Sequence, residues 1–287
     1  EARKLFEAAI VTQRATLGPR HLELANSLFS YGVLLKDRQE LKAADAALSE
    51  ALDIFGLDRF EAAHCLRYLG LSAMSQERYR DAAGLLTRAA ETYGSTLGPD
   101  DLQRWRAIAD LGWAHMKLRQ IPLARRELSE AVARIERITG PEGYELRMPL
   151  REMGETLAQA GATTEAIATL TRERRLAEKL FGTTQHLQVG GSDLLLAQAY
   201  LARGTPEDRQ AARRNLDEAI AIFTRVGPQD LFFAKTLLES GRLALAEKDR
   251  SRARRELAAA EPILAAHLPP THELIRETQR LRAKAGR

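Results

Sequence analysis

The sequence predicts an all-α protein, an α-solenoid built of antiparallel helix pairs, and three observations support this prediction. The loop at residues 96–100 recurs 42 residues later at 138–142 and, more weakly, at 180–183. A series of glycines keeps the same step, at positions 70, 112 and 154. Leu, Ala, Arg and Glu dominate the chain, which suits long helices. A fixed period of this length indicates stacked copies of one supersecondary unit.

The second helix of each predicted pair carries an Ala-x3-apolar-x2-Ala pattern. Spacings of four and three residues place these side chains on one helix face, and alanine lets a neighbouring helix approach closely. The pattern occurs at Ala2/Phe6/Ala9, Ala44/Leu48/Ala51, Ala82/Leu86/Ala89, Ala124/Leu128/Ala131, Ala212/Leu216/Ala219 and Ala253/Leu257/Ala260. In one further copy Ala166 and Leu170 are followed by Glu173, which we expect to be either exposed by a local shift or paired.

The first helix of each pair carries a small residue at a matching place. Glycine costs roughly 1 kcal/mol against alanine inside a helix, so its recurrence predicts a crossing where no side chain fits. The residues concerned are Gly32, Gly70, Gly112, Gly154 and Gly241, with Ala197 in the fifth copy. In that fifth copy, residues 204–208 lengthen the turn between the two helices.

These series set the helix limits. We expect first helices over 21–37, 58–76, 100–119, 142–160, 186–203 and 229–247, and second helices over 41–55, 78–96, 121–138, 163–181, 206–225 and 249–267. A lone second-type helix is expected over 1–16 and a final helix over 271–285. Gly-Pro pairs, as at 98–99, suit the end of one helix and the start of the next. The first repeat step is 38 residues, so the helix at 41–55 should lack about one turn, with an irregularity near Gly56.

We expect a single array over residues 1–287. It divides into a truncated repeat at 1–18, six repeats at 19–56, 57–98, 99–140, 141–182, 183–227 and 228–268, and a C-terminal capping helix at 269–287. Because the chain lacks an initiator Met and begins inside a predicted helix, we expect it to be a piece of a longer protein.

Helix pairs with small residues at their crossings, joined by Leu-Gly-Pro loops such as residues 17–19, resemble the tetratricopeptide repeat. The 42-residue step is similar to the longer repeat of kinesin light chains and many bacterial proteins. Arg- and Ala-rich arrays of this kind also resemble the C-terminal regions of bacterial serine/threonine kinases and other signalling proteins. The resemblance implies a right-handed superhelix whose first helices line a concave side that binds peptides or partner proteins.

Projected onto this sequence, the resemblance gives a set of candidate binding residues on the concave side. They are Phe29, Val33, Lys36, Arg67, Tyr68, Leu71, Met74, Arg106, Asp110, Trp113, Met116, Lys117, Arg151 and Glu155. Leu71 and Trp113 are equivalent in the repeat, so an apolar strip with arginines beside it is expected. Such residues are enriched at protein interfaces. The strip could equally be inter-repeat core, and both interpretations stay open.

Motifs for chemistry are absent from the sequence. It has no phosphate-binding glycine loop and no HExxH motif. Its six histidines are spread along the chain, several of them in the predicted loops, where capping or solvent exposure is the better interpretation. Cys65 is the one cysteine, so no disulfide can form within the chain. We therefore expect no cofactor, no metal and no enzyme activity in this fragment, although a catalytic domain could lie upstream of residue 1.

The charge pattern and the hydropathy of the sequence argue against two classes of partner, nucleic acid and membrane. Arg and Glu are interleaved along most helices, and acidic residues interrupt the basic clusters at 248–255 and 276–287, which argues against nucleic acid. The longest apolar run, near 194–202, is too short to cross a bilayer. The single cysteine favours a reducing, cytoplasmic location.

The expected function is a scaffold that binds a protein or peptide, as the interaction or regulatory region of a larger bacterial signalling protein. Two alternatives remain. One is a superhelix that senses a small molecule or short peptide. The other is a self-association module that forms a homo-oligomer through exposed ends of the solenoid.

Overall fold

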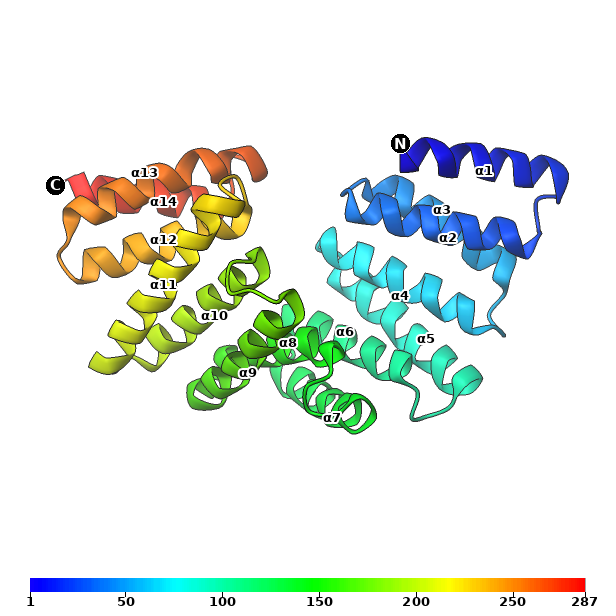
Figure 1. The fold of residues 1–287 in the computed structure, drawn as a ribbon, viewed down its shortest axis with the longest axis horizontal. Helices are drawn as coiled ribbons and strands as arrows, with labels where there is room; N and C mark the ends of the chain where they lie inside the picture. The colour runs from blue at the N-terminus through cyan, green and yellow to red at the C-terminus, as the bar shows by residue number, and fades with distance from the viewer. Residues whose placement is uncertain (287) are drawn as a thin grey trace. The chain divides into compact units, whose positions relative to one another are not determined.

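The computed structural model describes residues 1–286, and within them it contains fourteen α-helices, one short 3-10 helix and no strand (Figure 1). The elements are α1 (Ala2–Thr16), α2 (Leu22–Asp37), α3 (Leu41–Phe55), α4 (Phe60–Ser75), α5 (Tyr79–Leu97), α6 (Leu102–Lys117), α7 (Ile121–Thr139), η1 (Tyr144–Leu146), α8 (Arg147–Gln159), α9 (Thr163–Phe181), α10 (Leu187–Arg203), α11 (Pro206–Val226), α12 (Leu231–Ala246), α13 (Arg250–His267) and α14 (Glu273–Gly286). The prediction of an all-α solenoid is confirmed.

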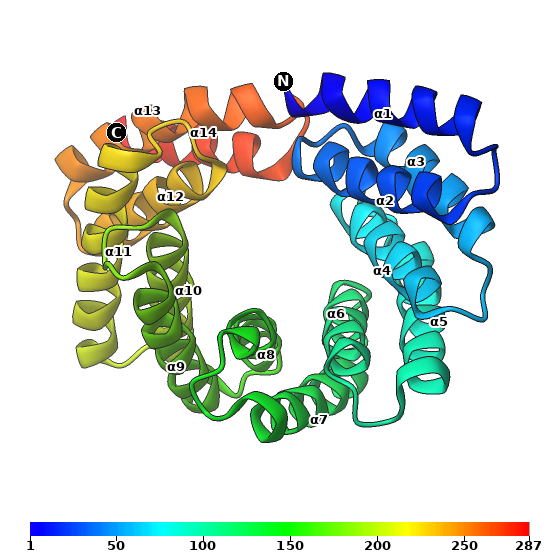
Figure 2. The same ribbon diagram turned by 45° about the vertical axis from the view of Figure 1, so that its right-hand side comes forward.

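The described residues fall into two compact units, the first over residues 1–156 and the second from residue 157 onward. Within the first unit, α2, α4 and α6 lie on the inner side of the curve and α3, α5 and α7 on the outer side (Figure 2). Within the second unit, α10, α12 and α14 are inner and α9, α11 and α13 are outer. The division into units does not test the repeat boundaries, which stay a prediction.

Four inner helices, α2, α4, α6 and α12, each pack against the outer helix that follows through a glycine–leucine crossing. A Cβ atom added to Gly32 would lie 2.6 Å from Leu48 Cγ. The corresponding distances are 2.7 Å from Gly70 to Leu86, 2.8 Å from Gly112 to Leu128 and 2.7 Å from Gly241 to Leu257. Real Cβ atoms do not approach so closely, so the expected crossings without a side chain are confirmed at these four glycines, and the one expected at Gly154 stays a prediction.

Two irregularities distinguish the first and fourth repeats. The outer helix α3 has 15 residues, whereas α5 and α7 have 19, so the predicted loss of one turn is confirmed. The inner helix expected to begin at residue 142 instead opens with the 3-10 turn η1, and regular α-helix starts at Arg147. Pro149 has no N–H and is suited to the first turn of α8, which accounts for the late start.

Histidines cap three of the inner helices. The Nδ1 atoms of His21, His186 and His272 each accept a hydrogen bond of 3.2 Å from the backbone N–H two residues later. The interpretation of the turn histidines as caps is therefore confirmed for these three. Because each histidine caps its helix in the same way, it serves as a reference residue from which equivalent positions on these inner helices can be counted.

Glu173 lies within α9, where other outer helices carry alanine. Its side chain is completely buried, so the interpretation that a local shift exposes it is wrong. The carboxylate takes part in a polar or electrostatic contact within the fold. This agrees with the rule that a buried charge needs compensation.

Candidate partner-binding site

An aromatic cluster joins the inner helices α2 and α4 of the first unit. We define it as Phe29, Phe60, His64, Tyr68 and Tyr93. The ring centroids of Phe29 and Tyr68 lie 5.4 Å apart edge to face, and those of Phe60 and His64 lie 5.5 Å apart. Phe60 is 40% exposed, which leaves part of the cluster open to a ligand. Ring pairs of this geometry add stability beyond their burial, so the surface is pre-formed.

His64 sits at the centre of the aromatic cluster. Its Nδ1 shares a hydrogen bond with the hydroxyl of Tyr93, which comes from the outer helix α5. Burial lowers the pKa of His64, and the positive charges of Arg67 and Arg106 lower it further. At neutral pH the side chain is therefore an uncharged ring. His64 lies next to Cys65, yet Cys65 is buried in the core and burial raises its pKa to about 12, so the two do not form a nucleophile pair.

Arg67 and Asp110 form an ion pair between α4 and α6. The Nε–Oδ2 distance is 2.6 Å, and the two side chains are 11% and 10% exposed. Because each charge neutralises the other in a nearly buried setting, the pair fixes one inner helix to the next. Both residues were expected to bind a partner, whereas the structure gives them a contact with each other.

Glu152 follows in the same inner row on α8. Its side chain is 3% exposed, and burial raises its pKa well above the ordinary value. The negative charges of Asp110 and Glu155 raise the pKa further, against the opposing charges of Arg67 and Arg151. The inner surface of the first unit thus holds a carboxyl group in an environment that favours its neutral form.

Arg106 on α6 differs from these residues because it is half-buried and its side chain has no partner. The side chain makes no hydrogen bond and no ion pair in the described part of the chain. Its positive charge lowers the pKa of both His64 and Tyr93, so it lies within electrostatic range of the aromatic cluster. An arginine side chain without an acceptor, near an accessible aromatic surface, is the feature of this inner face that is best suited to bind an anionic ligand.

The remaining candidates divide between core and surface. Met74 and Met116 are 5% and 0% exposed, so these two belong to the core and do not line a groove. Val33, Leu71 and Trp113 are half-buried. The two lysines lie over aromatic rings, with Lys36 Nζ 6.0 Å from the centroid of Tyr68 and Lys117 Nζ 5.6 Å from that of Trp113.

Arg151 is also buried, and its Nε lies 3.8 Å from Glu155 Oε1. The sequence candidates that the structure brings together at an accessible surface are therefore Phe29, Tyr68, Lys36 and Arg106. Phe60 completes that surface, and the fully buried Tyr93 supports it from beneath; both were missed. Phe60 is the first residue of its helix, and Tyr93 belongs to an outer helix, which the concave-side template excludes.

The inner face of the second unit has a different character. Gln198 on α10 donates to Glu239 on α12 at 3.3 Å, Arg242 donates to the same carboxylate at 2.6 Å, and Arg242 also pairs with Glu277 on α14. These polar groups satisfy one another from helix to helix. We therefore place the candidate site on the first unit.

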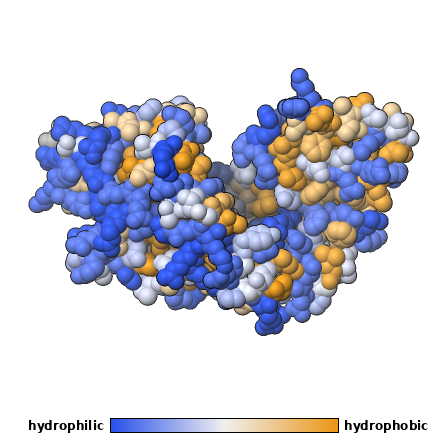
Figure 3. Space-filling view, viewed as in Figure 1, coloured by the Kyte–Doolittle hydropathy of each residue, from blue (hydrophilic) through white to orange (hydrophobic). Residues whose placement is uncertain are grey.

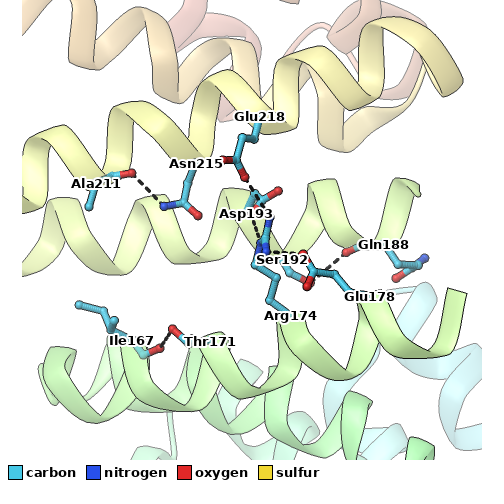
Figure 4. Close-up of polar contacts among 10 residues, drawn as sticks. All are labelled: Ile167, Thr171, Arg174, Glu178, Gln188, Ser192, Asp193, Ala211, Asn215 and Glu218. Carbon is cyan, nitrogen blue, oxygen red and sulfur yellow. Dashed lines mark hydrogen bonds and ion pairs between the residues drawn. The ribbon is translucent and has the colours of Figure 1, made fainter. Parts of the chain in front are cut away.

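A second ion cluster joins three helices of the second unit (Figure 4). Arg174 on α9 binds Asp193 on α10, Glu178 on its own helix and, at 2.9 Å, Glu218 on α11. The side chain of Asp193 is fully buried, and burial raises its pKa to about 7 despite the charge of Arg174. Nothing in the repeat pattern predicted this cluster.

No group of three His, Cys, Asp or Glu side chains among residues 1–286 could hold a metal ion. In the same residues, no helix is both long and apolar enough to span a bilayer.

Comparison with known proteins agrees with the repeat analysis. Residues 62–103 match the family model of the tetratricopeptide repeat. No curated protein matches the chain. This match confirms the prediction of tetratricopeptide repeats for residues 62–103, and solved structures of kinesin-light-chain-like repeat proteins share the fold of the chain.

Three solved structures illustrate the likeness. A chain of the APC/C hetero-tetramer Cut9-Hcn1 is 16% identical with a TM-score of 0.71, over 99% of this chain and 46% of that chain. BtubC (BKLC) from P. vanneervenii is 16% identical with a TM-score of 0.61, over 88% and 95%. A putative kinesin light chain repeat protein of P. anserina is 20% identical with a TM-score of 0.58, over 74% and 97%. This chain thus spans about half of the first of these, and the likeness is one of fold.

Proposed function

We propose that this tetratricopeptide repeat array binds a segment of a partner protein on the inner face of α2, α4 and α6. The observation that carries the proposal is Arg106, half-buried beside the aromatic cluster and without a hydrogen bond or ion pair in the described chain. Removing a guanidinium from water without an acceptor is unfavourable, so an anion supplied by a ligand would be bound there with little competition.

The surface also indicates what the partner segment presents. A carboxylate would accept two parallel hydrogen bonds from the Arg106 guanidinium. A neighbouring apolar side chain would pack on Phe60, Phe29 and Tyr68, of which Phe60 is the most open. Arginine and aromatic residues dominate the binding energy of protein interfaces, which supports this combination. One of the similar structures is a hetero-tetramer of a repeat protein with a second protein, which supports partner binding as the class of function.

The test is a selection of random decapeptides against the protein, followed by calorimetry on the enriched peptides. We expect enrichment of peptides in which an acidic residue neighbours an apolar one. Arg106→Ala should weaken their binding by about tenfold or more, equivalent to about 1.4 kcal/mol. Arg88→Ala is the matched control, because Arg88 is exposed on the outer helix α5 and has no partner in the described chain. Unchanged affinity in a folded Arg106→Ala variant would contradict the assignment.

The proposal extends to the setting of the array. We infer that it serves as the interaction or regulatory region of a larger bacterial signalling protein in the cytoplasm. The repeat length and the Arg- and Ala-rich composition support the signalling context, and a single, buried cysteine suits a reducing compartment. Localisation of the tagged full-length protein by fractionation tests the compartment.

Self-association is a second candidate that one observation favours. Leu5 and Val11 on α1 are 65% and 68% exposed, the highest values among the large apolar side chains of the described residues. Hydrophobic residues gather over α1–α3 on the face shown in Figure 3. If this surface joins two copies, light scattering should show a dimer that Val11→Glu dissociates. A monomer at high concentration would remove this candidate.

A further inference from the structure

We propose that the groove between α13 and α14 is a docking site for an acidic amphipathic helix of a partner protein. The groove encloses about 520 Å³ and belongs entirely to the second unit. Its floor is formed by the small residues Ala258 and Ala283, and its walls by Arg254, Glu261, Gln279 and Arg282. This site is separate from the inner face of the first unit and goes beyond the function proposed above.

The register of α14 explains why a helix fits the groove. Ala283 lies eleven residues after the capping His272, as Gly32 lies eleven after His21 and Ala197 eleven after His186. At this place an inner helix receives a leucine of the outer helix that follows, as Leu48 contacts Gly32. Ala283 is exposed among the described residues. The groove therefore has the form of a seat for a helix with an Ala-x3-Leu-x2-Ala face.

The charged residues around the groove indicate which charges a helix bound there would carry. Glu261, the acidic residue of the wall, is already bound by Arg282 and by Gln279, the latter at 3.0 Å. Arg254 is exposed and makes no hydrogen bond or ion pair in the described chain. Two more exposed arginines, whose side chains make no hydrogen bond or ion pair in the described chain, lie on the same stripes: Arg250 four residues before Arg254 and Arg276 seven before Ala283.

The rim is thus positive where the floor is small and apolar. An occupant with Asp or Glu on both sides of its apolar stripe would pair with these arginines while its leucine entered the seat. Opposite charges across an interface raise the association rate and select the partner. A basic helix of the same shape would meet uncompensated arginines and be rejected.

The experiment uses two synthetic helical peptides with the same Ala-x3-Leu-x2-Ala stripe, one flanked by glutamates and the other by lysines. Calorimetry with the full chain should show binding of the acidic peptide and not of the basic one. The affinity should fall as salt is added, because exposed charges are screened. Equal binding of the two peptides would overturn the proposal.

Three variants locate the site. Arg254→Glu should weaken binding of the acidic peptide by about tenfold or more, and Ala283→Leu should block it by filling the seat. Both residues are exposed, so the thermal unfolding of the two variants should match that of the unsubstituted chain. Arg88→Glu, an equal charge change on α5, should leave binding unchanged. Binding that survives Ala283→Leu would contradict a docked helix.

One other outcome is decisive. The basic rim could instead contact a phosphate backbone, which an oligonucleotide titration tests directly. Oligonucleotide binding that Arg254→Glu abolishes, together with no peptide binding, would overturn the proposal in favour of a nucleic-acid surface.

Discussion

Arg67 and Asp110 meet at 2.6 Å across two successive inner helices, and both are nearly buried. Removing one partner of such a pair leaves a charge without compensation. Arg67→Ala should therefore lower the free energy of unfolding by about 3–5 kcal/mol, measured by urea denaturation.

The exposed pair of Arg78 and Asp45 provides a control for this prediction. Its atoms are 3.1 Å apart, and the Arg78 side chain is 45% exposed. Arg78→Ala should change the free energy of unfolding by less than about 1 kcal/mol. If both variants lost the same free energy of unfolding, burial would not explain a larger contribution of the Arg67–Asp110 pair to stability.

The glycine crossings predict a contrast between two Gly→Ala substitutions. At Gly112 the new methyl group would lie 2.8 Å from Leu128 Cγ, whereas at Gly84 within α5 nothing lies within 4 Å. Gly112→Ala should destabilise the protein by about 1–3 kcal/mol through overpacking. Gly84→Ala should stabilise it by up to about 1 kcal/mol through helix propensity. Thermal unfolding of both variants measures the contrast, and a stabilised Gly112→Ala variant would be incompatible with the crossing.

Asp193 predicts a pH dependence of stability. Its pKa is raised to about 7 in the fold and lies near 3.9 in an unfolded chain, so the folded state favours the neutral acid. The contribution is fully present below about pH 4 and is lost as pH rises through 7. Between pH 5 and pH 8 the loss should reach about 2–3 kcal/mol.

The comparison variant is Asp193→Asn, which cannot titrate. The charges that face Asp193 are Arg174 and Glu178 from α9 and Glu218 from α11, and these remain in the variant. The difference in unfolding free energy between the two proteins should change with pH in the direction given. A constant difference from pH 5 to pH 8 would exclude Asp193 as the titrating group.

Cys65 predicts chemical inertness. The thiol is buried, and burial raises its pKa to about 12, so very little thiolate is present at neutral pH. Iodoacetamide should leave the folded protein unmodified, and alkylation followed by mass spectrometry should become fast only in denaturant. Rapid labelling under native conditions would mean that α4 opens readily.

The helices could be predicted closely because their signals are local. Glycines and alanines mark the crossings, and Gly-Pro pairs and histidines mark the turns, so the ends of α4, α7 and α11 fall within two residues of the expected limits. The start of α8 could not be predicted, because a 3-10 turn and an α-helical turn share the same hydrophobic pattern there.

For the candidate site, the sequence predicted which helix face carries the residues but not which of their side chains are accessible. Helical position placed Met116 and Arg106 on the same inner surface, yet Met116 is buried and Arg106 is half-buried without a partner. Which of them is available depends on the side chains of neighbouring helices. The contribution of Tyr93 and the cluster around Arg174 depend on contacts between inner and outer helices, which a one-helix pattern does not contain.

The pair of Arg67 and Asp110 is separated by 43 positions, close to one repeat. The glycine–leucine crossings of α2, α4, α6 and α12 are alike, so by themselves they would not distinguish one of these repeats from another. The ion pair is formed by different residues in adjacent copies and therefore encodes their order. A chain in which the second and third repeats were exchanged would keep its glycine–leucine crossings but lose the Arg67–Asp110 ion pair. The contacts between inner helices therefore specify the order of the repeats.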